Sequence, residues 1–287
     1  MTRRLFCFGL GYSAMALARR LKDDGWTIAG TTRTEEKWAT LQAEEIDAHL
    51  FSRDHPLSDP NEALKGVTHL LTSIAPDEVG DPVLGCHIEE LTAGDRIAWV
   101  GYLGTTGVYG DRNGAWVDEA DSPEPTLPRT ERRVAAEGHW LASGLPVHIF
   151  RLAGIYGPGR NALETVKSGR ARRVVKPGQM FGRVHVDDIA QTLLASIERP
   201  NPGAIYNVAD DEPAPPQDVI TYASELLGVE PPPEVPFEKA DLSAAARSFY
   251  ADNRRVANHR IRNELGVQLL YPNYREGLKA IYEGMNP

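Results

Sequence analysis

The sequence predicts a protein of the α/β class, built on a doubly wound parallel sheet. Two observations lead to this prediction. Apolar runs of strand type alternate with helical segments from Leu5 to about Ala209. The first strand is followed at once by a glycine-rich turn and a helix, which is the order found in a dinucleotide-binding unit. We therefore expect a Rossmann-type sheet with a smaller C-terminal substrate-binding lobe.

The glycine turn is the first half of that unit. The segment Gly9-Leu10-Gly11-Tyr12-Ser13-Ala14 follows an apolar strand and opens a helix with one apolar face. Gly9 allows a sharp turn, Gly11 lets a pyrophosphate approach the backbone, and Ala14 lets the helix pack closely on the strand. The N–H groups and the dipole of the helix start favour phosphate. We expect the cofactor to contact Gly9, Leu10, Gly11, Tyr12 and Ser13. The alternative is a purely structural turn.

The alternation continues along the chain. We expect strands over residues 5–8, 27–30, 47–51, 67–73, 96–102, 147–152 and 204–208. Helices are expected over residues 35–43 and 128–143 and from Asp187 onward. The expected dinucleotide-binding domain comprises residues 1–156, with residues 183–210 contributing to its sheet. Residues 157–182 and 211–287 form the expected smaller substrate or lid region, since much of this part is irregular and rich in Gly, Pro and Arg.

Composition narrows the classes of function. The 287 residues carry a net charge of −9 without a basic block, which argues against nucleic acid and anionic membranes as partners. No apolar run approaches the ~20 residues of a membrane span, and the start lacks a signal-peptide core, so we expect a cytoplasmic protein. The two cysteines and the histidines lack metal-ligand spacing, so no metal site is expected.

The end of the second expected strand indicates which cofactor is bound. An acidic residue there favours NAD, whereas a basic one pairs with the 2′-phosphate of NADP. This chain has Thr32 and Arg33, and the first acidic residue is Glu35. The arginine offers a planar fork to a phosphate, so we expect NADP rather than NAD. Ser73 and Ala75, at the end of the fourth strand, are expected near the cofactor.

Five segments in order resemble the extended short-chain dehydrogenases/reductases, which include sugar-nucleotide epimerases and dehydratases. They cover nearly the whole chain and are Gly9–Ala14, Thr105-Thr106-Gly107-Val108-Tyr109-Gly110, Arg151–Gly159, Val184-His185-Val186-Asp187-Asp188-Ile189-Ala190 and Ile205–Ala209. The resemblance implies the Rossmann-type fold and a nicotinamide cofactor. It also implies that Thr105 orients a substrate oxygen.

The catalytic dyad of that family is missing from this chain. The family uses a Tyr-x-x-x-Lys pair, in which lysine lowers the pKa of a tyrosine that moves the proton. Arg129 and Arg133 stand at the two positions, and arginine stays protonated at ordinary pH. Tyr109, His185 or a bound water would then transfer the proton, although packing is the favoured role for Tyr109 and a structural role is the favoured one for His185. The chain resembles atypical members of the family with a degraded dyad.

These observations leave three functions open. The first is an NADP-dependent oxidoreductase, epimerase or dehydratase with altered catalytic residues. The second is a non-catalytic NADP(H)-binding sensor or regulatory protein, and the third is a scaffold without nucleotide. A small-molecule substrate is expected for the enzyme, and Arg129 and Arg133 favour an anionic one, although a solvated helix face is equally consistent with them. The resemblance implies a homodimer through the helices beside the fourth and fifth strands, and the apolar stripe there is equally consistent with a place in the core.

Overall fold

The computed structural model describes residues 3–94 and 96–285 and divides into two compact units. The first unit comprises residues 1–105, 127–151 and 189–206. The second comprises residues 106–126, 152–188 and 207–287. Residues 106–126, which precede the expected boundary at residue 156, thus belong to the second unit. No helix among the described residues is long and apolar enough to cross a membrane.

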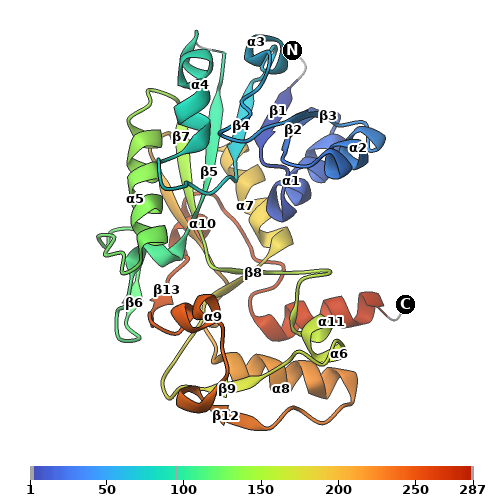
Figure 1. The fold of residues 1–287 in the computed structure, drawn as a ribbon, viewed down its shortest axis with the longest axis vertical. Helices are drawn as coiled ribbons and strands as arrows, with labels where there is room; N and C mark the ends of the chain where they lie inside the picture. Colours follow the sequence, from blue (N-terminus) through green and yellow to red (C-terminus); the bar gives the residue numbers. More distant parts are fainter. Residues whose placement is uncertain (1–2, 95, 286–287) are drawn as a thin grey trace. The chain divides into compact units, whose positions relative to one another are not determined.

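The largest sheet has seven strands in the order β11-β7-β5-β4-β1-β2-β3, of which β7 to β3 are labelled in Figure 1. Each neighbouring pair from β5 to β3 is parallel, which confirms the predicted doubly wound sheet. The strands are β1 (Arg4–Phe8), β2 (Thr27–Thr32), β3 (Asp47–Leu50), β4 (His69–Thr72), β5 (Trp99–Thr105), β7 (Val147–Leu152) and β11 (Ile205–Val208).

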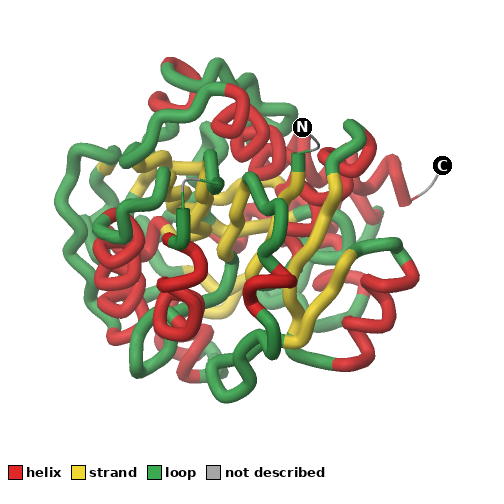
Figure 2. Tube along the Cα trace, turned by 90° about the horizontal axis from the view of Figure 1, so that it is seen from above, coloured by secondary structure: helices red, strands yellow, loops and turns green. Residues whose placement is uncertain are grey.

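Helices flank the strands of this sheet on both sides (Figure 2). One face packs against α3 (Pro60–Ala63), α4 (Pro82–Thr92) and α5 (Pro128–Leu141). On this side Phe6 and Phe8 of β1 share one apolar cluster with Trp140 of α5. The first unit also contains α1 (Tyr12–Asp23), α2 (Glu35–Ala43) and most of α7 (Val186–Glu198). The indole N–H of Trp99 in β5 donates to Ser196 Oγ of α7 at 3.0 Å.

The fifth strand lies three residues later than predicted. We expected residues 96–102, and β5 spans Trp99–Thr105. Gly101 lay inside the expected strand and Gly104 beyond it; both are strand residues, and neighbouring side chains fill the space that a Cβ would need. A Cβ on Gly101 would lie 2.3 Å from the Trp99 ring, and one on Gly104 would lie 2.9 Å from Glu137 Oε1. The glycines therefore allow close packing within the strand instead of ending it.

The second unit is built from short elements. Its strands are β6 (Trp116–Val117), β8 (Gly154–Tyr156), β9 (Arg173–Val175), β10 (Arg183–His185), β12 (Glu234–Pro236) and β13 (Arg255–Val256). Its helices are η1 (Thr106–Tyr109), α6 (Ala162–Lys167), α8 (Pro216–Leu227), η2 (Phe237–Lys239), α9 (Ala244–Phe249), α10 (His259–Asn263) and α11 (Tyr274–Met285). The sequence analysis assigned no element to most of these residues: the strands have two or three residues each and are too short for a clear period, whereas α8 and α11, with twelve residues each, were missed.

Candidate functional site

The turn between β1 and α1 has the geometry that its glycines predict. Gly9 has a φ of +85°, which L side chains rarely adopt, and a Cβ there would lie 2.8 Å from Ser73 Oγ. Gly11 stands at the N-cap of α1 with extended backbone. The atom nearest to a Cβ on Gly11 is Ser73 Oγ at 4.0 Å. Gly9 is thus required by the turn itself, whereas nothing in the first unit requires Gly11 to lack a side chain.

Two hydroxyl groups hold the peptide groups of Gly9. The N–H of Gly9 donates to Thr31 Oγ1 of β2 at 2.9 Å, and Ser73 Oγ donates to the Gly9 carbonyl at 2.5 Å. The Leu10 N–H donates to the Thr31 carbonyl, also at 2.9 Å. We call Thr31 and Ser73 the hydroxyl clamp. It fixes the backbone of the turn from the strands on either side of β1.

The predicted cofactor residues lie at the carboxyl ends of β1, β2 and β4, which are adjacent in the sheet. Tyr12 and Ser13 form the first turn of α1, and Thr32 is the buried last residue of β2. Arg33 and Ala75, which follow β2 and β4, are exposed. The sheet therefore brings these residues together at the carboxyl ends of its strands. Their contacts with a cofactor stay a prediction.

Arg133, which takes the place of the dyad lysine, is held against the end of β5. Its Nη1 donates to the Tyr102 hydroxyl at 3.2 Å and to the Leu103 carbonyl at 3.0 Å, and the guanidinium carbon lies 5.8 Å from the centre of the Tyr102 ring. Tyr102 is completely buried, and burial raises its pKa to about 12. This phenol is therefore neither accessible nor activated as a base. Arg129, one turn earlier on α5, is exposed.

Two buried carboxylates lie on the same side of the sheet. Glu137 of α5 receives hydrogen bonds from Arg151 of β7, the shortest at 2.8 Å. Asp81 caps the start of α4 and also accepts from the indole N–H of Trp140 at 2.9 Å. Burial raises the pKa of both carboxyl groups, and the Arg151 guanidinium opposes that effect at Glu137.

The predicted catalytic residues fall in different units. Thr105 is the half-buried last residue of β5 in the first unit. Tyr109 is fully buried in the second unit, and its hydroxyl donates to Asn207 Oδ1 at 2.9 Å. This bond gives Tyr109 a structural role, and its catalytic role stays a prediction. His185 is buried beside the start of α7, where its Nδ1 accepts from the Asp187 N–H at 3.2 Å.

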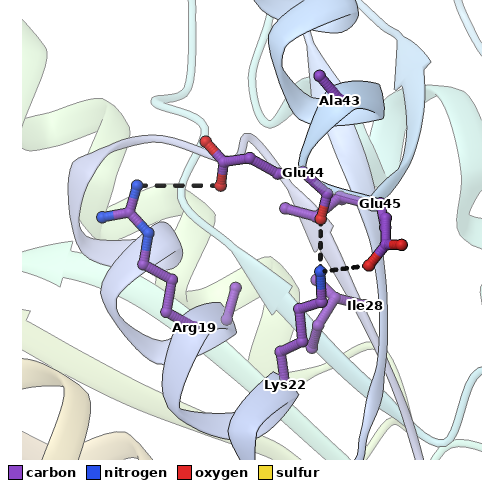
Figure 3. Close-up of a pocket in the computed structure, with 8 residues that line it drawn as sticks. Arg19, Lys22, Ile28, Ala43, Glu44 and Glu45 are labelled. Carbon is purple, nitrogen blue, oxygen red and sulfur yellow. Dashed lines mark hydrogen bonds and ion pairs between the residues drawn. The ribbon is translucent and has the colours of Figure 1, made fainter.

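A shallow pocket lies elsewhere in the first unit, beside the last turns of α1 and the end of α2 (Figure 3). Its charged side chains already pair with one another. Lys22 Nζ lies 3.3 Å from a Glu45 carboxylate oxygen, and Arg19 lies 3.9 Å from Glu44. This pocket contains none of the predicted cofactor residues. In the described parts of the chain, no group of three or more His, Cys, Asp or Glu residues could hold a metal ion.

Sequence reasoning missed several residues of the site. Thr31 was passed over for its neighbours Thr32 and Arg33, although alternation along β2 places the Thr31 side chain on the opposite face from that of Thr32. Gly30 was taken only as a strand end, yet a Cβ there would lie 2.5 Å from the Cys7 carbonyl. The contact of Arg133 with Tyr102 joins residues 31 positions apart and has no local signal.

Comparison with known proteins supports the resemblance seen in the sequence. No protein-family model matches the chain. A structure from Silicibacter pomeroyi DSS, described as a functionally unknown conserved protein, is 52% identical, with a TM-score of 0.91 and complete coverage of both chains. Protein YeeZ of Escherichia coli K12 is 28% identical over 94% of this chain and 97% of its own length. At 52% identity over its whole length, the chain belongs to the same family as the Silicibacter pomeroyi protein.

More distant structures identify the fold. UDP-glucuronic acid 4-epimerase from Bacillus cereus, solved in complex with NAD, is 16% identical, with a TM-score of 0.75 and coverage of 98% of this chain and 97% of that one. At that identity the likeness concerns the fold alone. The chain thus has the fold of the extended short-chain dehydrogenases/reductases.

Proposed function

We propose that this member of the Silicibacter pomeroyi protein's family binds a nicotinamide dinucleotide at the β1–α1 turn and acts as an NADP-dependent oxidoreductase or epimerase with altered catalytic residues. The observation that carries the proposal is the open space at Gly11. The fold itself does not need a glycine there, since a Cβ would meet nothing closer than 4.0 Å. A pyrophosphate approaching the backbone at the helix start would need it.

The preference for NADP rests on Arg33. Its side chain is exposed just beyond β2, next to the buried Thr32. An arginine fork there would pair with a 2′-phosphate, which NAD lacks.

The proposed change in chemistry concerns the group that transfers the proton. A bound nicotinamide supplies the hydride donor or acceptor. Thr105, at the carboxyl end of β5, is the proposed group that orients the substrate oxygen. Tyr109 or water would move the proton in place of the missing dyad, at a cost of roughly 10²–10⁴ in rate. The substrate is proposed to be a small molecule that carries an anionic group, and the proposed compartment is the cytoplasm.

Titration with NADPH and NADH tests the cofactor proposal. Gly11→Ala should weaken dinucleotide binding by at least tenfold while leaving the melting temperature nearly unchanged. Gly138→Ala is the matched control, since Gly138 lies in α5 with nothing within 4 Å of a Cβ, and it should leave binding intact. Wild-type affinity in Gly11→Ala would contradict a pyrophosphate at this turn.

A selectivity test addresses NADP itself. Arg33→Ala should weaken NADPH binding and leave NADH binding unchanged. Lys65→Ala removes an exposed cation that precedes β4, at the opposite end of that strand from Ser73, and should change neither. If the wild type binds both nucleotides equally, Arg33 has no role in selectivity.

A second candidate is a non-catalytic NADP(H)-binding sensor. It is favoured by Arg129 and Arg133, because they replace a titratable pair with two permanent cations, and the phenol that Arg133 contacts, Tyr102, is buried with a raised pKa. Assays of NADPH oxidation with aldehydes, ketones and nucleotide sugars separate the two. Turnover that is lost in Thr105→Val supports the enzyme, and binding without turnover across the panel supports the sensor.

A further inference from the structure

We propose that Arg133 is a fixed anion-binding residue for the substrate, held in position by Tyr102 and the Leu103 carbonyl. The group that it would bind is a carboxylate or a phosphate of the substrate. This inference rests on the proposed function, because it places the substrate at the carboxyl end of β5, where sheets of this kind bind ligands.

The hydrogen bonds of Arg133 leave part of its guanidinium unused. Both bonds are made by Nη1, to Tyr102 and to Leu103. Within residues 3–94 and 96–285, Nε and Nη2 have no hydrogen-bond partner, and the side chain is half-buried. The protein therefore holds Nη1 in place, while Nε and Nη2 remain available to a ligand. An anchored arginine loses little rotamer freedom when a ligand binds, and its planar donors match the two oxygens of a carboxylate or phosphate.

The carboxylates around Arg133 do not use up its donors. Asp81 and Glu137 are close enough for the Arg133 charge to act on them. However, Glu137 is hydrogen-bonded by Arg151, and Asp81 accepts from Trp140 and from the start of α4. Both acids thus have partners of their own, and neither forms an ion pair with Arg133.

The surrounding sequence adds positive charge. Arg129 and Arg132 precede Arg133 within the first two turns of α5, and Glu131 is the acidic residue of the first turn. This local excess of cations favours the approach of an anion.

The test uses inorganic phosphate and malonate as probes, titrated against the full chain with and without NADPH. Arg133→Met should weaken binding of both probes about tenfold or more. Tyr102→Phe should weaken it about threefold, although the arginine remains, because one of its two anchors is lost. The matched control is Arg96→Met. Arg96 is also half-buried and donates to a backbone carbonyl, that of Glu90, but it precedes β5 and should have no effect.

Several outcomes would overturn the inference. One is unchanged probe binding in Arg133→Met, and another is unchanged binding in Tyr102→Phe. A third is a parallel loss of NADPH affinity in Arg133→Met, which would assign the arginine to the cofactor. Failure of the wild type to bind any dinucleotide would instead refute the proposed function, and the probe titration without NADPH still decides the role of Arg133. Should Arg133→Met not fold, Arg133→Lys and Tyr102→Phe carry the test.

Discussion

The carboxyl ends of β1 and β5 belong to the same sheet, but they differ in what their residues supply. At β1 the turn is made of backbone groups and small residues, fixed by the hydroxyl clamp of Thr31 and Ser73. Near the end of β5 the corresponding groups are large side chains that α5 supplies. Arg129 and Arg133 stand at the two positions where the family has its tyrosine and lysine. The comparison teaches that backbone recognition constrains sequence through geometry, whereas proton chemistry depends on single side chains that can change without loss of the fold.

The largest expected effect is on stability and concerns the packing of α5 on the sheet. Arg151→Met should destabilise the protein by about 3–5 kcal/mol, because it leaves the buried Glu137 carboxylate without its partner. Urea unfolding measures the change in the free energy of unfolding. Lys65→Met, which breaks an exposed ion pair with Glu62, should cost about 0–1 kcal/mol and serves as the control. A loss below about 1 kcal/mol in Arg151→Met would mean that the buried pair does not hold α5 to the sheet.

The next effect concerns the β1 side. Gly30→Ala should cost about 1–3 kcal/mol, since the added Cβ would lie 2.5 Å from the Cys7 carbonyl and 2.8 Å from Leu10 Cδ1. Thermal unfolding of Gly30→Ala is compared with that of Gly138→Ala, which adds a methyl group in open space. The difference between the two melting temperatures measures the cost of the steric overlap. Equal stability of the two variants would show that the close approach of β2 to β1 imposes no constraint.

A smaller effect tests the hydroxyl clamp. Ser73→Ala and Thr31→Val each remove one hydrogen bond to Gly9, so each should weaken dinucleotide binding by about 1 kcal/mol, or roughly fivefold. Calorimetric titration measures this loss. Thr31→Ser keeps the hydroxyl and should restore binding. If Thr31→Ser binds the dinucleotide as weakly as Thr31→Val, the methyl group of Thr31 and not its hydroxyl group supports binding.

The smallest effect is a difference in pH dependence. Burial raises the pKa of Asp81 and Glu137, so the folded chain holds these protons more tightly than the unfolded chain. The free energy of unfolding should therefore fall as pH rises from the ordinary carboxyl range through the raised folded values. Asp81→Asn should make this slope shallower, as measured by urea unfolding at several pH values. Equal slopes in the wild type and Asp81→Asn would contradict it.

The β1–α2 region could be predicted closely from the sequence, and the structure shows why. The helix expected over residues 35–43 is α2 within the same bounds, and its start is marked by Thr34, whose side chain accepts from the Lys37 N–H. The glycine turn is likewise a local signal. In contrast, the end of β5 was misplaced because Gly104, which lies beyond the expected strand, packs against the Glu137 carboxylate, and Glu137 is distant in sequence.

The residues of the candidate site likewise divide into those that local sequence predicts and those that depend on distant contacts. Gly9 and Gly11 follow from spacing alone, and the structure places them in the expected turn. The partners of Arg133 could not be predicted, because Tyr102 and Leu103 belong to another element and the contact depends on how α5 packs on the sheet. The sequence analysis recognised that the dyad was absent, but only tertiary structure reveals what holds the replacement.

The segment Asn253–Asn258, which contains β13, affects how the second unit can form. Asn253 accepts from the Arg112 and Gly114 N–H groups and donates to the Gly178 carbonyl. Asn258 donates to the Ala209 carbonyl. These bonds join residues that lie far apart in the sequence, up to about 140 positions for Arg112 and Asn253, and contacts of this kind form slowly. During synthesis the second unit must therefore wait until residue 258 has left the ribosome, whereas β1 to β4 can pair long before. Translation speed and chaperone supply should consequently limit the second unit more than the first.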